Sequence, residues 1–204
     1  MAKVRIAVLA SGSGTNAERL IQHVQGRIDM QVERVYSNLA SAGVHDRAER
    51  LNVPSHVFSK SELASGELLK RLLDDGIDFV VLAGFLLQVP ESMASHFSGR
   101  MVNLHPALLP LFGGKGMYGA HVHQAVHQAV LHEGLRQTGI TLHWVTPAYD
   151  EGAIFFQASA PLTLDDNASS IVDIISELEC KYFALEVERA IESCFSLDRR
   201  SVGN

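Results

Sequence analysis

The chain has 204 residues, of which 47% are hydrophobic and 20% are charged, a composition typical of a globular protein with a substantial core. Its formal net charge is −6 and it has no block of lysine or arginine, which argues against nucleic acid or an anionic membrane as the main partner. No apolar run approaches the ~20 residues of a membrane span, and the N-terminal segment lacks a signal-peptide core, so we expect a cytoplasmic protein.

The predicted elements alternate between strand and helix along most of the chain. Residues 4–10 form an apolar run closed by a glycine-rich turn, and Asn16 marks the expected start of the first helix. Residues 79–83 are continuously apolar, as expected for a strand that helices cover on both faces. Further strands are expected at 32–36, 55–58 and 101–104, and further helices at 44–51, 62–74, 91–96 and 122–133.

The last third of the chain follows a different pattern. Residues 140–145 and 153–160 predict two strands joined by a turn, a spacing typical of an antiparallel pair. Residues 168–195 predict a long helix, and the polar tail 198–204 is expected to fray. We therefore expect a single α/β domain over residues 1–204, Rossmann-like, with a doubly wound, mostly parallel sheet and an antiparallel C-terminal strand addition. Both a monomer and a homodimer are compatible with the sequence.

The end of the strand near 101–104 carries the most informative polar residues, Asn103 and His105. Two residues apart on an extended backbone, their side chains point to the same side and can reach one reacting atom. A histidine moves protons near neutral pH and an amide can donate a hydrogen bond to a developing oxyanion, which suits acyl or formyl transfer. The alternative is a turn histidine ahead of Pro106 whose ring is satisfied structurally.

The turn that ends in Gly14, Thr15 and Asn16 lies between the first expected strand and helix. Glycines at such a turn let backbone amides approach a ligand, and a helix N-terminus attracts phosphate. A dinucleotide site would need a third glycine, where this chain has Ala17, and an acidic residue after the second strand, where it has a Ser-Asn pair. The turn favours a monophosphate over a nicotinamide cofactor, with a purely structural turn as the alternative.

Two other segments give weaker signals. The loop 113–119 lacks the Ser or Thr that follows the lysine of a nucleotide-binding phosphate loop, so it is interpreted as a mobile lid or an inert loop. His121, His123, His127 and His132 follow on one expected helix. Without a His-Glu-x-x-His pattern they indicate a solvated face rather than a metal site. We expect no metal.

Asp150 lies in the turn between the two C-terminal strands. A turn aspartate usually caps its own backbone, but a sheet that brings Asp150 close to His105 would let the carboxylate orient the imidazole and favour its protonated form. Thr141 and His143 lie on the same side of the preceding strand and are expected to support this cluster. For His143 the alternative is a core histidine with a satisfied ring.

Four motifs together closely resemble the glycinamide ribonucleotide formyltransferases of purine biosynthesis, over nearly the whole chain. They are Asn-x-His-Pro followed by Leu-Leu-Pro, the Gly-Ser-Gly-Thr-Asn turn, Leu-Ala-Gly-Phe after the buried strand, and the late Asp-x-Gly. The resemblance implies an enzyme that transfers the formyl group of 10-formyltetrahydrofolate, a co-substrate, to the amine of glycinamide ribonucleotide, with small molecules as partners. It assigns Asn103, His105 and Asp150 to catalysis by direct amine attack, oxyanion stabilisation and proton relay.

The resemblance also implies the binding residues. Glu179 matches a contact to the substrate's ribose, and Gly14, Thr15 and Asn16 match the phosphate-binding turn. The folate pocket matches Phe85, Leu86, Leu87, Gln88, Val89 and Val145, together with the rest of the turn up to Asp150.

This sequence departs from the family pattern at three places. Leu86-Leu87 replace a common Met-Arg, Cys180 replaces a histidine, and the loop 113–119 is longer. Two alternatives stay open: a hydrolase that uses the same three residues to release formate, and a binding module for folate or phosphate without turnover.

Overall fold

The structure is a computed structural model that describes residues 3–201, with side chains to residue 195. One sheet contains seven strands in the order β3-β2-β1-β4-β5-β6-β7. The strands are β1 (Val4–Leu9), β2 (Met30–Ser37), β3 (Ser55–Val57), β4 (Phe79–Leu82), β5 (Met101–His105), β6 (Gln137–Trp144) and β7 (Ile154–Pro161).

Strand direction divides the sheet into two parts. The neighbours from β3 to β5 pair in parallel, whereas β6 pairs antiparallel with both β5 and β7. All four residues of β4 are buried, as expected for a strand covered on both faces. The predicted fold class is therefore confirmed.

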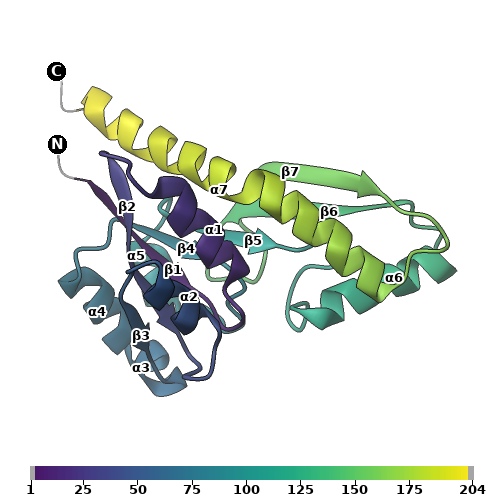
Figure 1. The fold of residues 1–204 in the computed structure, drawn as a ribbon, viewed down its shortest axis with the longest axis horizontal. Helices are drawn as coiled ribbons and strands as arrows, with labels where there is room; N and C mark the ends of the chain where they lie inside the picture. The colour runs from purple at the N-terminus through teal and green to yellow at the C-terminus, as the bar shows by residue number, and fades with distance from the viewer. Residues whose placement is uncertain (1–2, 202–204) are drawn as a thin grey trace.

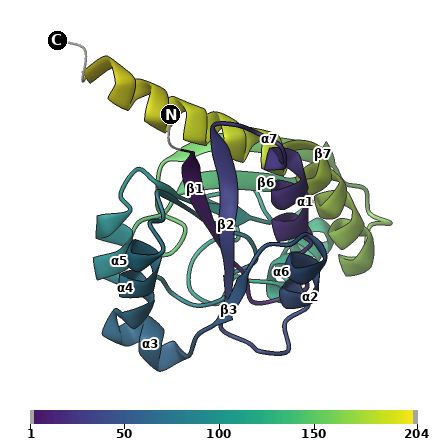
Figure 2. The ribbon, with the colours of Figure 1, turned by 60° about the vertical axis from the view of Figure 1, so that its left-hand side comes forward.

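Helices cover both faces of the sheet (Figures 1 and 2). On one face, side chains of α1, α2, α6 and α7 pack with Ile6 and Val8 of β1; on the other, side chains of α3, α4 and α5 pack with Ala7 and Leu9. The helices are α1 (Thr15–Val24), α2 (Val44–Arg50), α3 (Lys60–Ser65), α4 (Glu67–Asp74), α5 (Glu91–His96), α6 (Ala120–His132) and α7 (Ala168–Ser201).

At two places a glycine explains why the helices differ from the expected ones. The segment 62–74 is part of two helices, because Gly66 adopts a φ of 85° that ends α3 before α4 begins. The first helix begins at Thr15 rather than after Asn16, with Gly14 at its N-cap and a φ of 78°. A Cβ on Gly14 would lie 2.5 Å from Val44, so this turn needs glycine for space as well as for conformation.

The long C-terminal helix α7 packs along α1, and its C-terminal part extends past the sheet (Figure 1). Its backbone continues through Ser201, so the tail expected at 198–204 begins within the helix, and its last three residues lie outside the described range. Within the described part of the chain, no helix is long and apolar enough to cross a membrane.

Candidate active site

Two cavities lie at the carboxyl ends of the parallel strands, where open α/β sheets bind ligands. The larger has a volume of about 710 Å³ and the smaller about 270 Å³. Five residues line both cavities, so the two spaces adjoin: Gly12, Asn16, Gly84, His123 and Glu179.

The structure brings Asn103, His105 and Asp150 together in the larger cavity. β5 presents Asn103 and His105, while Asp150 reaches them from the turn after β6 with a φ of 54°. Asn103 Nδ2 lies 3.4 Å from Asp150 Oδ1, and His105 Nδ1 lies 3.6 Å from Asp150 Oδ2. Because β6 runs antiparallel to β5, it ends beside the start of β5, where Trp144 pairs with Val102, and the turn that follows brings Asp150 back to Asn103 and His105.

His143 orients the amide of Asn103. The two residues are directly opposite each other in the β5–β6 pair, and Asn103 Nδ2 donates to His143 Nε2 at 3.0 Å. His143 Nδ1 donates to the Trp144 carbonyl at 3.1 Å, and its Nε2 also lies 3.5 Å from Asp150 Oδ1. His143 is thus a buried histidine with a satisfied ring, and it also supports the site.

Thr141 lies opposite His105 in the same pair of strands but does not line either cavity. Its hydroxyl donates to the Ala107 carbonyl at 2.6 Å and accepts from the Leu109 N–H at 3.0 Å. Thr141 therefore holds the segment that follows His105 against β6 instead of joining the polar cluster.

The glycine-rich loop supplies two contacts that the sequence did not suggest. His105 Nε2 donates to the carbonyl of Phe112 at 2.8 Å, and the N–H of Gly114 donates to Asp150 Oδ2 at 2.9 Å. Residues 114–119 also line the larger cavity. Backbone groups make both contacts, so no side-chain pattern could have predicted them.

Burial decides the charge state of His105. Desolvation lowers its pKa, and the nearby Asp150 carboxylate and the Phe112 carbonyl oppose this only in part, so the pKa stays below its usual value. Asp150 therefore favours the protonated form of His105, as expected, but burial outweighs this effect. For Asp150, burial raises the pKa, but contacts with His143, the Gly114 N–H and His105 outweigh it, and the pKa lies below its usual value. The resting pair is a neutral imidazole beside a carboxylate.

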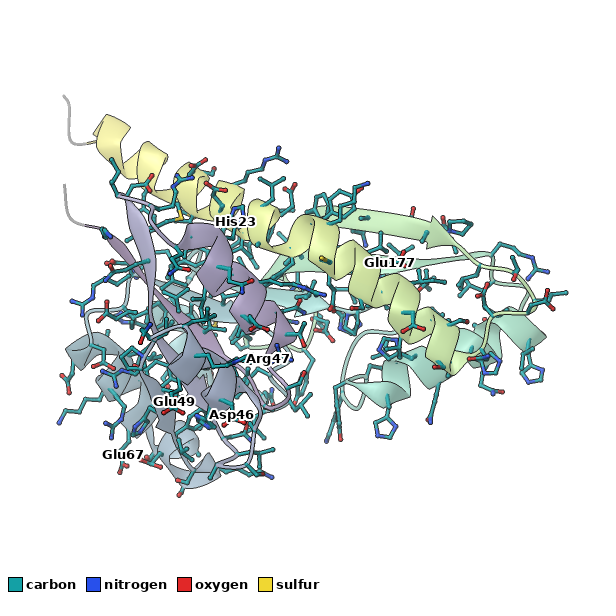
Figure 3. The ribbon with its side chains drawn as sticks, viewed as in Figure 1. His23, Asp46, Arg47, Glu49, Glu67 and Glu177 are labelled. Atoms are coloured by element: carbon teal, nitrogen blue, oxygen red, sulfur yellow. The ribbon has the colours of Figure 1, made fainter. Side chains whose placement is uncertain are left out.

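The turn with Gly14, Thr15 and Asn16 lines the smaller cavity. Arg47 of α2 reaches this turn from beside α1 (Figure 3) and donates from Nε to the Ser13 carbonyl at 2.8 Å. Its guanidinium also forms an ion pair with Glu18 of α1. α2 therefore holds the turn in place.

Glu179 of α7 lies between the two cavities. Its Oε2 accepts from Asn16 Nδ2 at 2.9 Å and lies 3.7 Å from an Arg19 nitrogen. Burial raises the pKa of Glu179, and these two neighbours counter the effect in part. The side chain of Cys180, which follows it, is exposed and a free thiol.

All of the expected folate residues line the larger cavity. Gln88 Nε2 donates to the Pro147 carbonyl at 3.2 Å, which joins the segment after β4 to the turn that carries Asp150. Two lysines, Lys60 and Lys115, border the same space. The expected folate residues in the lining are Phe85, Leu86, Leu87, Gln88, Val89 and Val145.

The expectation of a solvated histidine face on α6 holds only in part. His121 and His132 are exposed, whereas His123 and His127 are half-buried, and of these two only His123 lines the cavities. Helical periodicity could have shown this, because His123 lies seven residues before the buried Val130 and so shares its face. Among the side chains that the structure describes, residues 3–195, no group of three or more His, Cys, Asp or Glu residues could hold a metal.

Gly152 keeps the Asp150 turn close to β6. A Cβ at this position would lie 1.6 Å from the Trp144 carbonyl oxygen, so Gly152→Ala must push the turn away from the strand. We expect the variant to lose about 1–3 kcal/mol of unfolding free energy, measured by urea denaturation. The neighbouring Glu151→Ala, at an exposed position, should unfold like the wild type; equal stability of the two variants would contradict this account.

Comparison with known proteins defines the class. A family model described as formyl transferase matches residues 4–187. The chain belongs to the formyl transferase family, and the resemblance noted in the sequence is thereby confirmed.

Individual relatives agree with the family assignment. The chain is 34% identical over 194 residues to a chloroplastic phosphoribosylglycinamide formyltransferase of Arabidopsis thaliana, covering 92% of this chain and 65% of that protein. It is 31% identical to the human trifunctional purine biosynthetic protein adenosine-3, covering 89% of this chain and 18% of that protein. The chain thus spans less than two thirds of the length of these relatives.

Solved structures share the same fold. A glycinamide ribonucleotide transformylase 1 from Symbiobacterium toebii has a TM-score of 0.79 and 31% identity, with 91% of this chain and 86% of that chain covered. A phosphoribosylglycinamide formyltransferase from Streptococcus pneumoniae has a TM-score of 0.76 and 32% identity, with 96% and 99% covered.

Proposed function

We propose that the protein transfers the formyl group of 10-formyltetrahydrofolate to the amine of glycinamide ribonucleotide, in purine biosynthesis. The observation that carries this proposal is the cluster of Asn103, His105 and Asp150 in a cavity that adjoins a glycine turn suited to phosphate. The printed names of the Arabidopsis and Symbiobacterium relatives support the same activity.

The proposed reaction begins when the substrate amine attacks the formyl carbon, forming a C–N bond and turning the carbonyl oxygen into an oxyanion. Asn103 donates a hydrogen bond to that oxygen. A proton leaves the amine for His105 Nδ1, the ring nitrogen left basic when Nε2 donates to Phe112. The Asp150 carboxylate stabilises the resulting imidazolium, which then gives the proton to N10 of the folate as the C–N10 bond breaks. The products are the formylated amine and tetrahydrofolate.

Removal of the Asn103 amide tests the oxyanion step. We expect Asn103→Ala to lower kcat by a factor of about 10² to 10³ with little change in KM, because the hydrogen bond strengthens as charge develops. Asn103→Asp keeps the size of the side chain but cannot donate, so it should be equally impaired in a steady-state transfer assay. Near-normal turnover of either variant would rule out this role.

We place the substrate phosphate in the smaller cavity, at Gly14, Thr15 and Asn16, and the ribose beside Glu179. The pterin and formyl group then lie in the larger cavity, along Phe85 to Val89 and Val145. A substrate that spans both cavities would bring its amine to His105. No metal takes part in this proposed chemistry.

Arg47 is expected to matter for binding of the phosphate. The Ser13 carbonyl and the Gly14 N–H belong to one planar trans peptide group and point in opposite directions. Because Arg47 holds the carbonyl, the Gly14 N–H is directed to the other side, toward the cavity that Gly14 lines. Arg47→Met should therefore raise the KM for glycinamide ribonucleotide severalfold and leave the KM for the folate unchanged. Arg50→Met is the matched control, since Arg50 also pairs with Glu18. Equal effects of both variants would indicate a role in helix packing alone.

The deciding experiment is a spectroscopic transfer assay on the purified protein, with glycinamide ribonucleotide compared against other small amines. Formate release without an amine would instead indicate a hydrolase that uses the same residues. Binding of a folate analogue by calorimetry, with no turnover, would indicate a binding module. Transfer to glycinamide ribonucleotide alone is the expected result.

We further propose that the chain acts as one formyltransferase domain with small molecules as its partners, in the cytoplasm. The Arabidopsis relative is named as chloroplastic, so location is best tested by tagging the protein in its own cell. Sedimentation equilibrium would distinguish a monomer from a homodimer.

A further inference from the structure

His123 of α6 borders both cavities, and the catalytic account above makes no use of it. Its Nδ1 atom is buried and has no hydrogen-bond partner among the residues that the structure describes. A buried N–H without a partner costs about 1–3 kcal/mol, which favours the tautomer with the ring proton on Nε2. Nε2 is therefore the ring nitrogen available to a ligand in the cavities that His123 lines.

The charges around the smaller cavity indicate what His123 binds. Of the described residues that line this cavity, His123 alone can carry a positive charge, and Glu179 is the one carboxylate. Arg19, the nearest arginine on α1, is held by Asn16 and Glu179 and does not line the cavity. A phosphate in this cavity would accept hydrogen bonds from backbone amides of the glycine turn. His123 would be the one lining side chain able to offer it a positive charge.

We propose that His123 binds the phosphate of the amine substrate, with a ring N–H donating to a phosphate oxygen across the cavity from the glycine turn. This inference rests on the function proposed above, which places the phosphate in the smaller cavity. It adds a specificity role: His123 would let the enzyme discriminate a phosphorylated acceptor from the same amine without phosphate.

The electrostatic setting of the ring is consistent with this role. Burial lowers the pKa of His123, and His105 lowers it further when its own ring is charged. An anion beside the ring removes part of this penalty, because it favours the charged form. The bound phosphate and a protonated His123 would therefore stabilise each other.

The test compares two acceptors, glycinamide ribonucleotide and the corresponding riboside without phosphate, on the wild type and His123→Gln. We expect kcat/KM for the phosphorylated acceptor to fall roughly ten- to hundredfold, as for loss of a hydrogen bond to a charged group. The value for the riboside and the KM for the folate should change little. The ratio of the two kcat/KM values does not depend on the folded fraction of the sample, so a less stable variant still gives a valid result.

His127→Gln is the matched control, because His127 lies one turn later on α6 and lines neither cavity. It should keep the wild-type preference for the phosphorylated acceptor. A wild type that transfers to both acceptors equally would overturn the placement of the phosphate, and with it the proposed function. A wild type that prefers the phosphorylated acceptor, with the same preference in His123→Gln, would overturn the role of His123 alone.

Discussion

Replacement of His105 by alanine is expected to lower kcat for formyl transfer by a factor of about 10² to 10⁴, the range typical of a lost general acid–base group. The imidazole is the group that can accept the amine proton and return it to the leaving nitrogen, since Nδ1 faces the cavity's carboxylate and Nε2 is already bound to Phe112. Single-turnover kinetics with saturating folate would measure the chemical step directly.

His96→Ala is the control for this prediction, because His96 is an exposed histidine on α5 outside both cavities. It should keep full activity. Thermal unfolding of both variants separates loss of chemistry from loss of structure, since His105 is buried and its removal leaves a small void. A folded His105→Ala variant whose rate falls by less than about tenfold would refute the role of His105 as the acid–base group.

Asp150→Asn is expected to lower kcat/KM by roughly 10² to 10⁴, as when a catalytic histidine elsewhere loses its carboxylate partner. The substitution keeps the shape of the side chain but removes the charge that would stabilise the imidazolium. It also changes the pH profile. His105 must be neutral to act as a base, so activity falls when the pH drops through its pKa, which burial already holds below the usual value.

The sign of the pH shift follows from the contacts of His105. The Asp150 carboxylate raises the pKa of His105, so its removal must lower that pKa further and move the acid limb of the pH–kcat/KM profile to lower pH. Glu151→Gln, which neutralises the exposed neighbouring carboxylate, should leave the profile unchanged. An acid limb that moves to higher pH in Asp150→Asn would mean that His105 does not act as the base.

The sequence predicted most of the fold because its signals are local. Continuous burial of β4 follows from an apolar run, and the alternation of strands with helices implies a parallel sheet. Errors in the expected helix ends occurred at single glycines, because hydrophobic periodicity does not show where a glycine ends or begins a helix. Gly66 ends a helix inside a pattern that looks continuous, and Gly14 starts one earlier than the Asn16 signal indicated.

The sequence predicted which residues form the candidate site, but not the contacts that those residues make with one another. Alternation along β5 placed Asn103 and His105 on one side, and the structure brings Asp150 to them. The antiparallel return of β6 also pairs Asn103 with His143, a contact between residues 40 apart in the chain. Thr141 has the same strand periodicity as His143, yet its hydroxyl is used to hold the segment after His105.

Residue order alone determined the α/β class, the paired amide and imidazole at a strand end, and the glycine turn, because each depends on neighbours in the chain. Only the tertiary structure decided that His105 rests neutral, since its pKa reflects burial by segments far apart in sequence. Only the tertiary structure placed the Phe112 carbonyl beside His105 and the Gly114 N–H beside Asp150. The tertiary structure also placed His123 at the boundary between two cavities, although the periodicity of α6 already put His123 on the same face as the buried Val130.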